Sequence, residues 1–170
     1  MSFKEIKTED FTDNPFEMIG KRWLAVAGEA DGKSNVMTAS WGGLGVLWGK
    51  QVAFIFLRTT RYTKELVDKA DGCSLSVFPD SDDDHHMMQY FGTVSGRDED
   101  KIKKAGLTVL HDGGRTYFDE AELVLLCRKL YAQPMDQPFF IDKACDERWY
   151  ADHQYHTTYV AEIEKLLVKE

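Results

Sequence analysis

Short strand-like segments recur along this chain, and turn residues separate them. The clearest segment is residues 52–57 (VAFIFL), a continuous apolar run of strand length whose pattern favours burial on both faces. Asp31-Gly32 is a strong hairpin signal, and residues 112–114 (DGG) form a second turn. The predicted strands are a short N-terminal strand or extended arm, then residues 23–27, 35–41, 52–57, 73–78, 116–118, 121–132 and 156–167.

Helices are expected to be few and short. The predicted helices are residues 15–20, 64–70 and 98–105. In the last of these, Asp98 is a plausible N-cap and Gly106 a plausible stop. The predicted loops are a glycine loop at residues 42–45, a polar loop at 80–86 and a long ordered loop or lid at 133–154.

The order of these elements favours a mainly β fold, closed or partly closed into a barrel, because about six to eight short strands accompany only two or three helices. Strands and helices do not alternate along the chain. A doubly wound parallel sheet, which requires that alternation, therefore fits poorly.

Size and charge narrow the classes of function. The chain of 170 residues suits one domain, residues 1–170, with its own core. A net charge of −8, from 21 basic and 29 acidic residues, argues against nucleic acid as a partner but leaves room for a local basic patch. The three cysteines include no CxxC pair and indicate neither a disulfide framework nor a zinc site. No signal peptide or membrane-length apolar run is found, so we expect a cytoplasmic protein.

Residues 58–64 (RTTRYTK) combine three cations, three hydroxyl groups and a phenol just before a predicted helix. The first turn of a helix offers free N–H groups and a partial positive charge. Arg58 and Arg61 can bind phosphate oxygens through two hydrogen bonds each, and the threonines add donors. The segment therefore predicts a phosphate pocket. The alternative is a solvated turn in which Thr63 caps the helix.

Two other segments could approach a ligand. The glycines of residues 41–45 (WGGLG) permit close backbone approach to a flat molecule, but a GxGxxG dinucleotide motif is absent because Trp48 occupies the third position. A bend at a barrel corner is the alternative for this segment. Residues 95–98 (SGRD) can form a second ligand-facing edge or a plain helix cap. Neither metal-ligand spacing nor a nucleophile–base pair is recognisable, so no catalytic or metal-binding residue is assigned.

Taken together, these segments resemble the flavin reductase-like family of FMN-binding split barrels. The resemblance is carried by five blocks in order, which are residues 35–45 (NVMTASWGGLG), 58–66 (RTTRYTKEL), 92–101 (GTVSGRDEDK), 123–133 (LVLLCRKLYAQ) and, more weakly, 155–167 (YHTTYVAEIEKLL). It implies an antiparallel split β-barrel with a Greek-key core, acting as a homodimer. The DDDHH run at 82–86 and residues 133–154 depart from the family pattern, so the substrate of relatives does not transfer to this chain.

The resemblance also implies a flavin site. The FMN ring would lie against Met37, Thr38, Ala39, Ser40 and Trp41, where backbone N–H groups and Ser40 meet its polar edge. The residues expected near the phosphate are Arg58, Thr60, Arg61, Tyr62 and Thr63, and those near the ribityl chain or ring edge are Ser95, Gly96 and Arg97. Flavin would supply the redox chemistry of an oxidoreductase with NADH or NADPH as donor. The alternative is a non-catalytic FMN-binding protein that serves as a flavin carrier, store or sensor.

Overall fold

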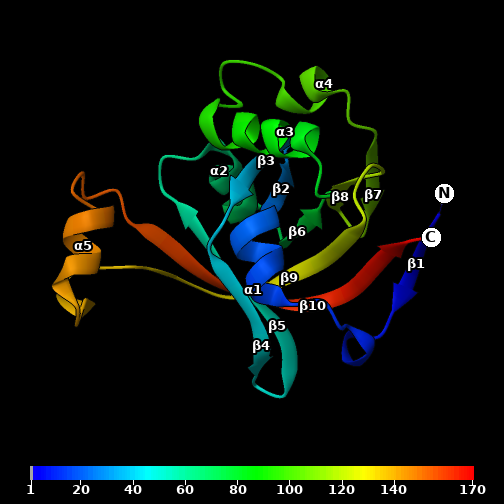
Figure 1. Cartoon of the computed structure of the whole chain (residues 1–170). Helices are drawn as coiled ribbons and strands as arrows, with labels where there is room; N and C mark the ends of the chain where they lie inside the picture. Colours follow the sequence, from blue (N-terminus) through cyan, green and yellow to red (C-terminus); the bar gives the residue numbers. More distant parts are fainter. Residues whose placement is uncertain (1) are drawn as a thin grey trace.

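An antiparallel β-sheet forms the body of the protein (Figure 1). The computed structural model describes residues 2–170. The main sheet has the strand order β3-β2-β6-β9-β10-β5-β4, with β1 beside β10, while β7 and β8 pair separately. The strands are β1 (Phe3–Ile6), β2 (Leu24–Ala30), β3 (Lys33–Ala39), β4 (Gly42–Leu47), β5 (Lys50–Arg58), β6 (Gly72–Val77), β7 (Val109–Asp112), β8 (Arg115–Phe118), β9 (Leu123–Pro134) and β10 (His156–Lys169).

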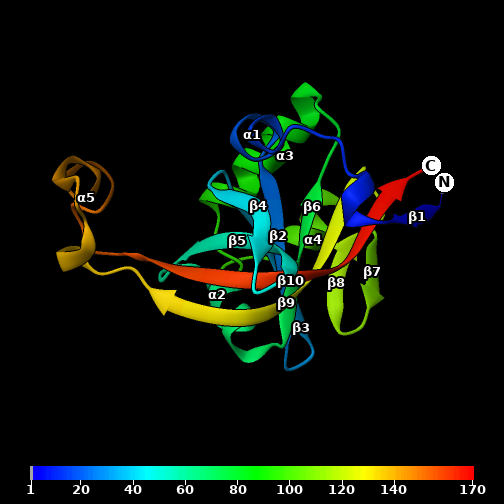
Figure 2. The ribbon, with the colours of Figure 1, turned by 90° about the horizontal axis from the view of Figure 1, so that it is seen from below.

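The two end strands of the main sheet are consecutive in the chain. β3 ends at Ala39 and β4 begins at Gly42, so Ser40 and Trp41 alone join the opposite ends of the strand order. Figure 2 shows the long strands β9 and β10 crossing the whole body beside the shorter strands. The sheet therefore curls round on itself, and the segment predicted to meet the flavin ring bridges its open side.

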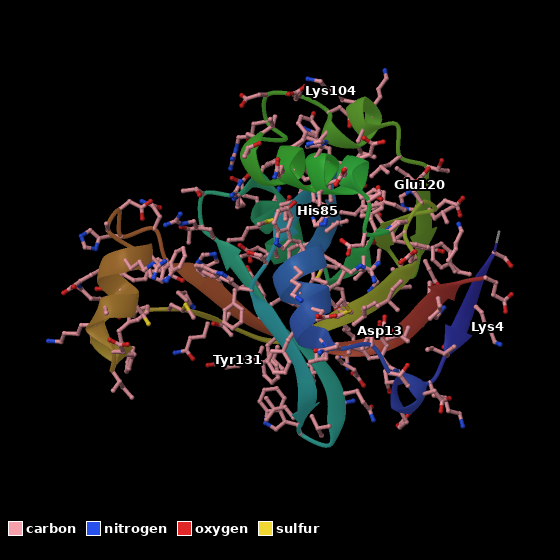
Figure 3. All side chains as sticks on the ribbon, viewed as in Figure 1. Lys4, Asp13, His85, Lys104, Glu120 and Tyr131 are labelled. Atoms are coloured by element: carbon pink, nitrogen blue, oxygen red, sulfur yellow. The ribbon has the colours of Figure 1, made fainter. Side chains whose placement is uncertain are left out.

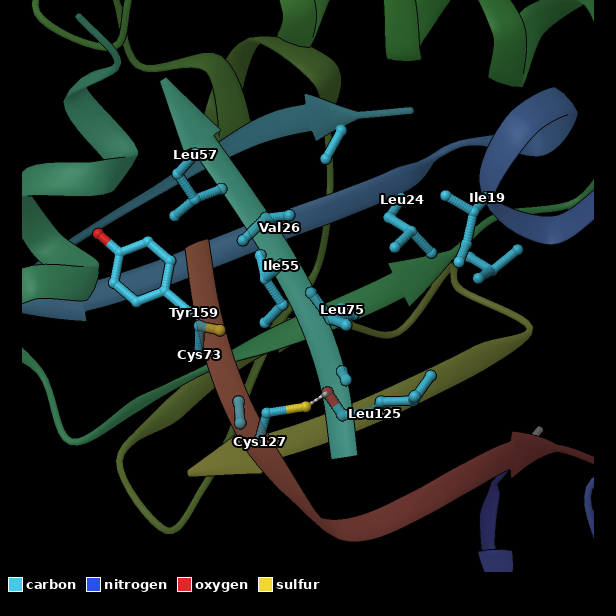
Figure 4. Close-up of a cluster of buried hydrophobic side chains, with 14 of the residues drawn as sticks. Ile19, Leu24, Val26, Ile55, Leu57, Cys73, Leu75, Leu125, Cys127 and Tyr159 are labelled. Carbon is cyan, nitrogen blue, oxygen red and sulfur yellow. Dashed lines mark hydrogen bonds between the residues drawn. The ribbon is translucent and has the colours of Figure 1, made fainter. Parts of the chain in front are cut away.

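One hydrophobic core fills the inside of this curled sheet. Val26, Ile55, Leu75, Leu125 and Tyr159 come from five different strands, and all are at most 3% exposed. Figure 4 shows these side chains converging between the strands. The interior is therefore closed by apolar packing and leaves the ligand sites to the edges of the sheet.

A second core lies on the outer face of the sheet, beneath helix α3 (Asp82–Thr93). Phe91 of α3 and Phe118 of β8 are fully buried there, together with Val36 of β3 and Val124 of β9. This packing fixes the end of α3 against β3, next to the predicted ring segment.

The predicted strands are confirmed, with boundaries that shift by a few residues. The Asp31-Gly32 hairpin is also confirmed, because both residues have positive φ angles, 53° and 71°. The predicted burial of residues 52–57 on both faces is wrong, because Ala53, Ile55 and Leu57 on one face are buried while Phe54 and Phe56 on the other are only partly buried. The hairpin strand β7 was not predicted.

The polar loop predicted for residues 80–86 is wrong, because residues from Asp82 onward form the first turns of α3. Ser81 is the N-cap, and its side chain accepts a hydrogen bond from the Asp84 N–H. Three aspartates in the first turn also face the positive end of the helix dipole. The acidic run therefore stabilises the start of a helix, although its polar composition favoured a loop in the sequence analysis.

Helix α4 (Lys101–Ala105) is shorter than the helix predicted for residues 98–105. The N-cap is Asp100, not Asp98, and its side chain accepts from the Lys103 N–H at 3.0 Å. Residues 95–99 instead form a turn in which the Asp98 N–H donates to the Ser95 carbonyl. The predicted stop at Gly106 is confirmed by its left-handed conformation, with φ 72°.

The glycine loop predicted for residues 42–45 is wrong, since these residues begin strand β4, which pairs with β5. The ring of Phe54 covers Gly43, which is opposite it, and Gly45 two residues further on: Cβ atoms on these glycines would lie 3.7 and 3.5 Å from its carbons. A cross-strand aromatic side chain thus supplies the packing that the glycines lack.

The loop or lid predicted for residues 133–154 is more regular than expected. β9 continues to Pro134, and the connection contains a 3₁₀ turn (Gln137–Phe139) and helix α5 (Lys143–Trp149). We call residues 135–155, which join β9 to β10, the arm. Figures 1 and 2 both place α5 away from the rest of the body.

The remaining helices lie before β2 and after β5 in the chain. α1 (Pro15–Glu17) runs into a π-helical turn (Met18–Arg22), and α2 (Tyr62–Lys69) follows β5 directly. Within residues 2–170, no helix has the length and apolar character needed to cross a membrane.

Candidate functional site: two adjoining hollows at the open side of the sheet

All predicted site residues except Arg97 line two hollows that share Met37, Arg58 and Arg61. The first, of about 150 Å³, we call the basic hollow; the second, of about 240 Å³, we call the aromatic hollow. The basic hollow is lined by Asn35, Met37, Arg58, Thr60, Arg61, Tyr62, Thr63, Thr93, Val94, Ser95, Gly96 and Lys101. The aromatic hollow is lined by Met37, Thr38, Ala39, Ser40, Trp41, Phe56, Arg58, Arg61, Trp149 and His156.

The N-terminus of α2 opens onto the basic hollow. Arg61 is the N-cap residue in an extended conformation, and no side chain caps this helix. Thr63 is therefore not the cap, and it lies inside the first turn with its hydroxyl accepting from Asn35 Nδ2 at 2.9 Å. Its hydroxyl proton is left free to donate. The first-turn N–H groups of an uncapped helix are available to an anion.

A half-buried arginine and a fully buried lysine line the same hollow. Arg61 Nη1 donates to the Gly92 carbonyl at 2.6 Å, and Lys101 Nζ donates to the Phe91 carbonyl at 2.8 Å. These carbonyls belong to the last turn of α3, where cations are favourable. Within residues 2–170, neither cation has a carboxylate within salt-bridge distance. Two positive charges are thus held together without a negative partner.

The pKa values of these cations record that environment. Burial lowers the pKa of Lys101 from 10.5 to about 8, and repulsion by Arg61 lowers it further in the same direction. Burial also lowers the pKa of Arg61, with a second contribution from Arg58. A buried charge without a partner is costly, so an anion that enters the basic hollow gains what these side chains lack.

Close packing shapes the edge of the basic hollow at Gly96. A Cβ atom at this position would lie 2.2 Å from Oδ1 of Asn35, which is only 4% exposed. Any larger residue would displace the amide that supports Thr63. Glycine is therefore required here, because the backbone of residue 96 approaches the Asn35 side chain closely.

The aromatic hollow is walled by rings from four segments of the chain. Trp41 lies 5.1 Å from Trp149 and 5.0 Å from His156, measured between ring centroids, and Phe56 adds a fourth ring. Trp41 and Trp149 are 39% and 47% exposed, respectively. Rings left half-exposed beside a hollow can contact a flat aromatic ligand.

The ring segment, residues 37–41, presents mainly backbone to this hollow. The Thr38 hydroxyl donates to the Met88 carbonyl of α3, so it is not available to a ligand. Met37 and Ala39 are almost fully buried in the core beneath. Because β3 ends the strand order and pairs only with β2, the polar groups left open in this segment are those on its unpaired edge and the Ser40 hydroxyl.

His156 is held as a neutral ring. Burial, followed by repulsion from Arg58 and Arg61, lowers its pKa from 6.5 to about 4. Its Nδ1 lies 2.8 Å from the Tyr150 hydroxyl. At neutral pH the imidazole therefore has one N–H and one lone pair and contributes no charge to the hollow.

Arg58 and Arg97, which were expected near the phosphate and near the ribityl chain or ring edge, both hydrogen-bond to other parts of the protein. Arg58 lines both hollows, but its guanidinium hydrogen-bonds to the Trp149 and Gln154 carbonyls and to Asp152 of the arm. Arg97 lines neither hollow, and it bonds to the Thr60 carbonyl and to Glu65. Its guanidinium also lies 5.2 Å from the centre of the Tyr62 ring.

Several lining residues were not predicted: Phe56, Thr93, Val94, Lys101, Trp149 and His156. Lys101 had one usable signal, because it is the first residue of a short helix just after the SGRD edge. Trp149 had none, since its position depends on how the arm folds back. The signal at His156 is ambiguous, because a histidine that opens a strand beside Tyr155 can face a ligand but more often lies in the core or on the surface.

A larger hollow of about 820 Å³ lies on the side of the barrel remote from α5 and contains none of the predicted residues. Asp13 and Glu120, labelled in Figure 3, line it together with Asp10, Asp119, Glu122 and Glu170. Its cations Arg22 and Lys169 are already paired with Glu122 and Asp119. The excess of carboxylates disfavours a phosphate there, so size alone does not identify the candidate site.

The curled antiparallel sheet with ligand-sized hollows at its open side defines a mainly β barrel protein. The chain belongs to the flavin reductase-like domain family, whose sequence model matches residues 20–170. This membership confirms the resemblance drawn from the five blocks of sequence. No curated protein sequence matches the chain.

Solved structures agree on the fold. Flavoredoxin from Methanosarcina acetivorans is 20% identical with a TM-score of 0.66, over 88% of this chain and 69% of that one. An FMN-binding domain of a flavin reductases-like enzyme from Shewanella baltica OS155 is 12% identical, with a TM-score of 0.69 over 98% and 77%. Flavin reductase PheA2 is 14% identical, with a TM-score of 0.62 over 94% and 90%. At these identities the likenesses establish the split-barrel fold alone, as predicted.

Proposed function

We propose that this protein is an FMN-binding flavoprotein and acts as an NAD(P)H-dependent flavin reductase or a related oxidoreductase. The observation that carries the proposal is the pair of cations, half-buried Arg61 and buried Lys101, which within residues 2–170 have no carboxylate partner and lie beside a hollow walled by aromatic rings. A phosphate on one side and a flat ring on the other are what FMN presents. Family membership supports the same ligand.

The basic hollow suits the phosphate. Arg61 and Lys101 supply charge, and the free first-turn N–H groups of α2 supply directed donors. Thr60, Tyr62 and Thr63 line the same wall. Ser95 and Gly96 form the opposite edge, near the ribityl chain, while Arg97 acts from outside by fixing the Thr60 carbonyl.

The aromatic hollow suits the ring. Residues 37–41 line it, so the unpaired edge of β3 and the Ser40 hydroxyl can meet the polar edge of the ring, and Trp41 provides an apolar wall. Bound flavin would supply hydride and electron transfer, which explains why the chain needs no nucleophile or acid–base pair. The residues of this chain bind and orient the ligand, and the neutral His156 adds a hydrogen-bonding group without a charge.

The phosphate assignment is tested with Arg61→Ala. Loss of a hydrogen bond to a charged group weakens binding by about 1.5–3 kcal/mol, or roughly 10- to 150-fold. Calorimetric titration should show that loss for FMN and almost none for riboflavin, which has no phosphate. Equal losses for the two flavins would refute the assignment.

The activity is tested by turnover. Protein as purified is inspected for bound flavin, and consumption of NADH and NADPH is followed with and without added FMN. Oxidation of either nicotinamide that depends on both protein and FMN supports the reductase. A protein that binds FMN but oxidises neither donor would instead be a flavin carrier, store or sensor.

We also propose a homodimer. The arm and the neighbouring strand β9 expose large apolar side chains, with Phe139 76% and Tyr131 45% exposed, and Trp48 on the β4–β5 turn is 60% exposed. Such a surface favours association with a partner of matching shape. Light scattering should report twice the monomer mass, and a monomer that still binds FMN tightly would contradict the proposal.

A further inference from the structure

Arg58 connects the two hollows to the arm. Its Nε donates to the Gln154 carbonyl at 2.9 Å, while Nη2 donates to the Trp149 carbonyl at 3.1 Å and to Asp152 Oδ1 at 3.0 Å. The guanidinium also lies 5.9 Å from the centre of the Tyr150 ring. A planar guanidinium suits this role, because its fixed fork meets several acceptors at once.

These contacts are a large share of what ties the arm to the barrel. Five hydrogen bonds join the end of β5 to residues 149–155: three come from Arg58 and two from Thr59. α5 itself stands away from the body in both ribbon views. Other contacts also hold the arm, among them the Trp149 ring on Trp41 and the Tyr150 hydroxyl on His156, so loss of the Arg58 bonds should loosen the arm.

The part of the arm that Arg58 holds also forms a wall of the aromatic hollow. Trp149 is the last residue of α5, and its ring stands edge-on to Trp41 at 5.1 Å. Arg58 bonds to the carbonyl of this same residue. Moving the 149–154 backbone would therefore move the Trp149 ring away from the hollow.

We propose that Arg58 is a positioning residue, which clamps residues 149–154 so that Trp149 closes one side of the aromatic hollow and determines how the second substrate fits there. The inference rests on the proposed function for the identity of the bound flavin. It replaces the expected phosphate role of Arg58, because its Nε and Nη2 already donate to the arm and only Nη1 is left for another partner. Arg61 and Lys101 then provide the phosphate charge.

The clamp is tested first without any flavin. Lys143 and Arg148 lie in the exposed helix α5 and are sites for trypsin. Arg58→Ala and Asp152→Ala should each make trypsin cut there about tenfold faster, the order expected from losing a charged hydrogen bond. Their effects should be less than additive in the double variant, because the two side chains form one interaction. Asp152→Asn keeps an acceptor oxygen for Arg58 and should stay close to the wild type.

The second test separates positioning from phosphate binding. Arg58→Ala should leave the ratio of FMN to riboflavin affinity within about twofold of the wild type, whereas Arg61→Ala lowers it at least tenfold. In NADH oxidation, Arg58→Ala and Asp152→Ala should raise the KM for NADH about fivefold, the order of one lost aromatic contact, with kcat within about twofold. Trp149→Ala should reproduce that change while Arg58 is intact.

Two results would overturn the inference. One is an unchanged cleavage rate in both single variants, which would show that Arg58 does not hold the arm. The other is a loss of FMN binding in Arg58→Ala with riboflavin binding retained, which would make Arg58 a phosphate ligand. If the wild type binds neither flavin, the proposed function fails, but the cleavage comparison still decides whether the clamp exists.

Discussion

Replacing Lys101 by methionine should strengthen the folded protein at neutral pH while weakening its binding of FMN. The side chain is 2% exposed, and its pKa falls from 10.5 to about 8 on folding. At about 1.4 kcal/mol per pKa unit, keeping this ammonium charged destabilises the folded state by roughly 3 kcal/mol relative to the unfolded chain. Methionine removes that cost and fills similar space, but it leaves the Phe91 carbonyl without its donor at about 1 kcal/mol. The free energy of unfolding should therefore rise by about 2 kcal/mol at pH 7.

The gain should depend on pH in a defined direction. Between pH 8 and 10.5 the unfolded chain binds more protons at Lys101 than the folded protein, so this residue makes the wild type more stable as the pH rises. Lys101→Met lacks that rise. Urea unfolding without flavin should show the variant ahead at pH 7, level near about pH 9.5, and slightly behind above about pH 10.5.

The binding side of the same experiment uses calorimetry with FMN and riboflavin. FMN affinity should fall roughly 10- to 100-fold, typical of a lost charged hydrogen bond, and riboflavin affinity should barely change. The reasoning is refuted if Lys101→Met destabilises the protein at pH 7 and leaves FMN affinity intact, because Lys101 would then serve the fold alone. Lys103→Met is the matched control, since Lys103 lies on the same short helix and is exposed.

Three further outcomes follow from the geometry. Gly96→Ala should lower FMN affinity about tenfold in calorimetry, since its Cβ would displace Asn35 from Thr63; unchanged binding would show that this edge is free to move. His156→Gln should alter the rate of NADH oxidation but not its pH profile between about pH 5 and 8, because the pKa of His156 is already about 4; loss of an inflection near pH 6.5 would contradict this. Arg97→Ala should affect flavin binding less than Arg61→Ala in the same titration, because Arg97 lines neither hollow.

Local signals predicted most of the strands and most of the site. The phosphate segment could be recognised because charge, hydroxyl groups and a helix start occur together within seven consecutive residues at 58–64. Helix α3 could have been recognised as well, because Ser81 and Asp84 have the spacing of a capping box before an apolar run. Its acidic first turn was mistaken for solvent-exposed loop.

Long-range contacts account for what the sequence could not predict. Lys101 belongs to the site because the end of α3 supplies the Phe91 carbonyl that holds it, ten residues away. Trp149 is held beside the aromatic hollow by a hydrogen bond from Arg58, which is 91 residues earlier in the chain. No periodicity or spacing rule reports such contacts, because each depends on the finished packing of the sheet.

The cations of the basic hollow link the fold to its ligand. Arg61 and Lys101 cap the carbonyl end of α3, which stabilises the helix, but their mutual repulsion and burial oppose that gain. An anion in the hollow offsets the repulsion without removing either cap. A ligand that binds only the folded protein stabilises it according to its concentration and affinity. At equal concentrations FMN should therefore raise the melting temperature more than riboflavin does, and in Lys101→Met that difference should shrink because the repulsion is already gone.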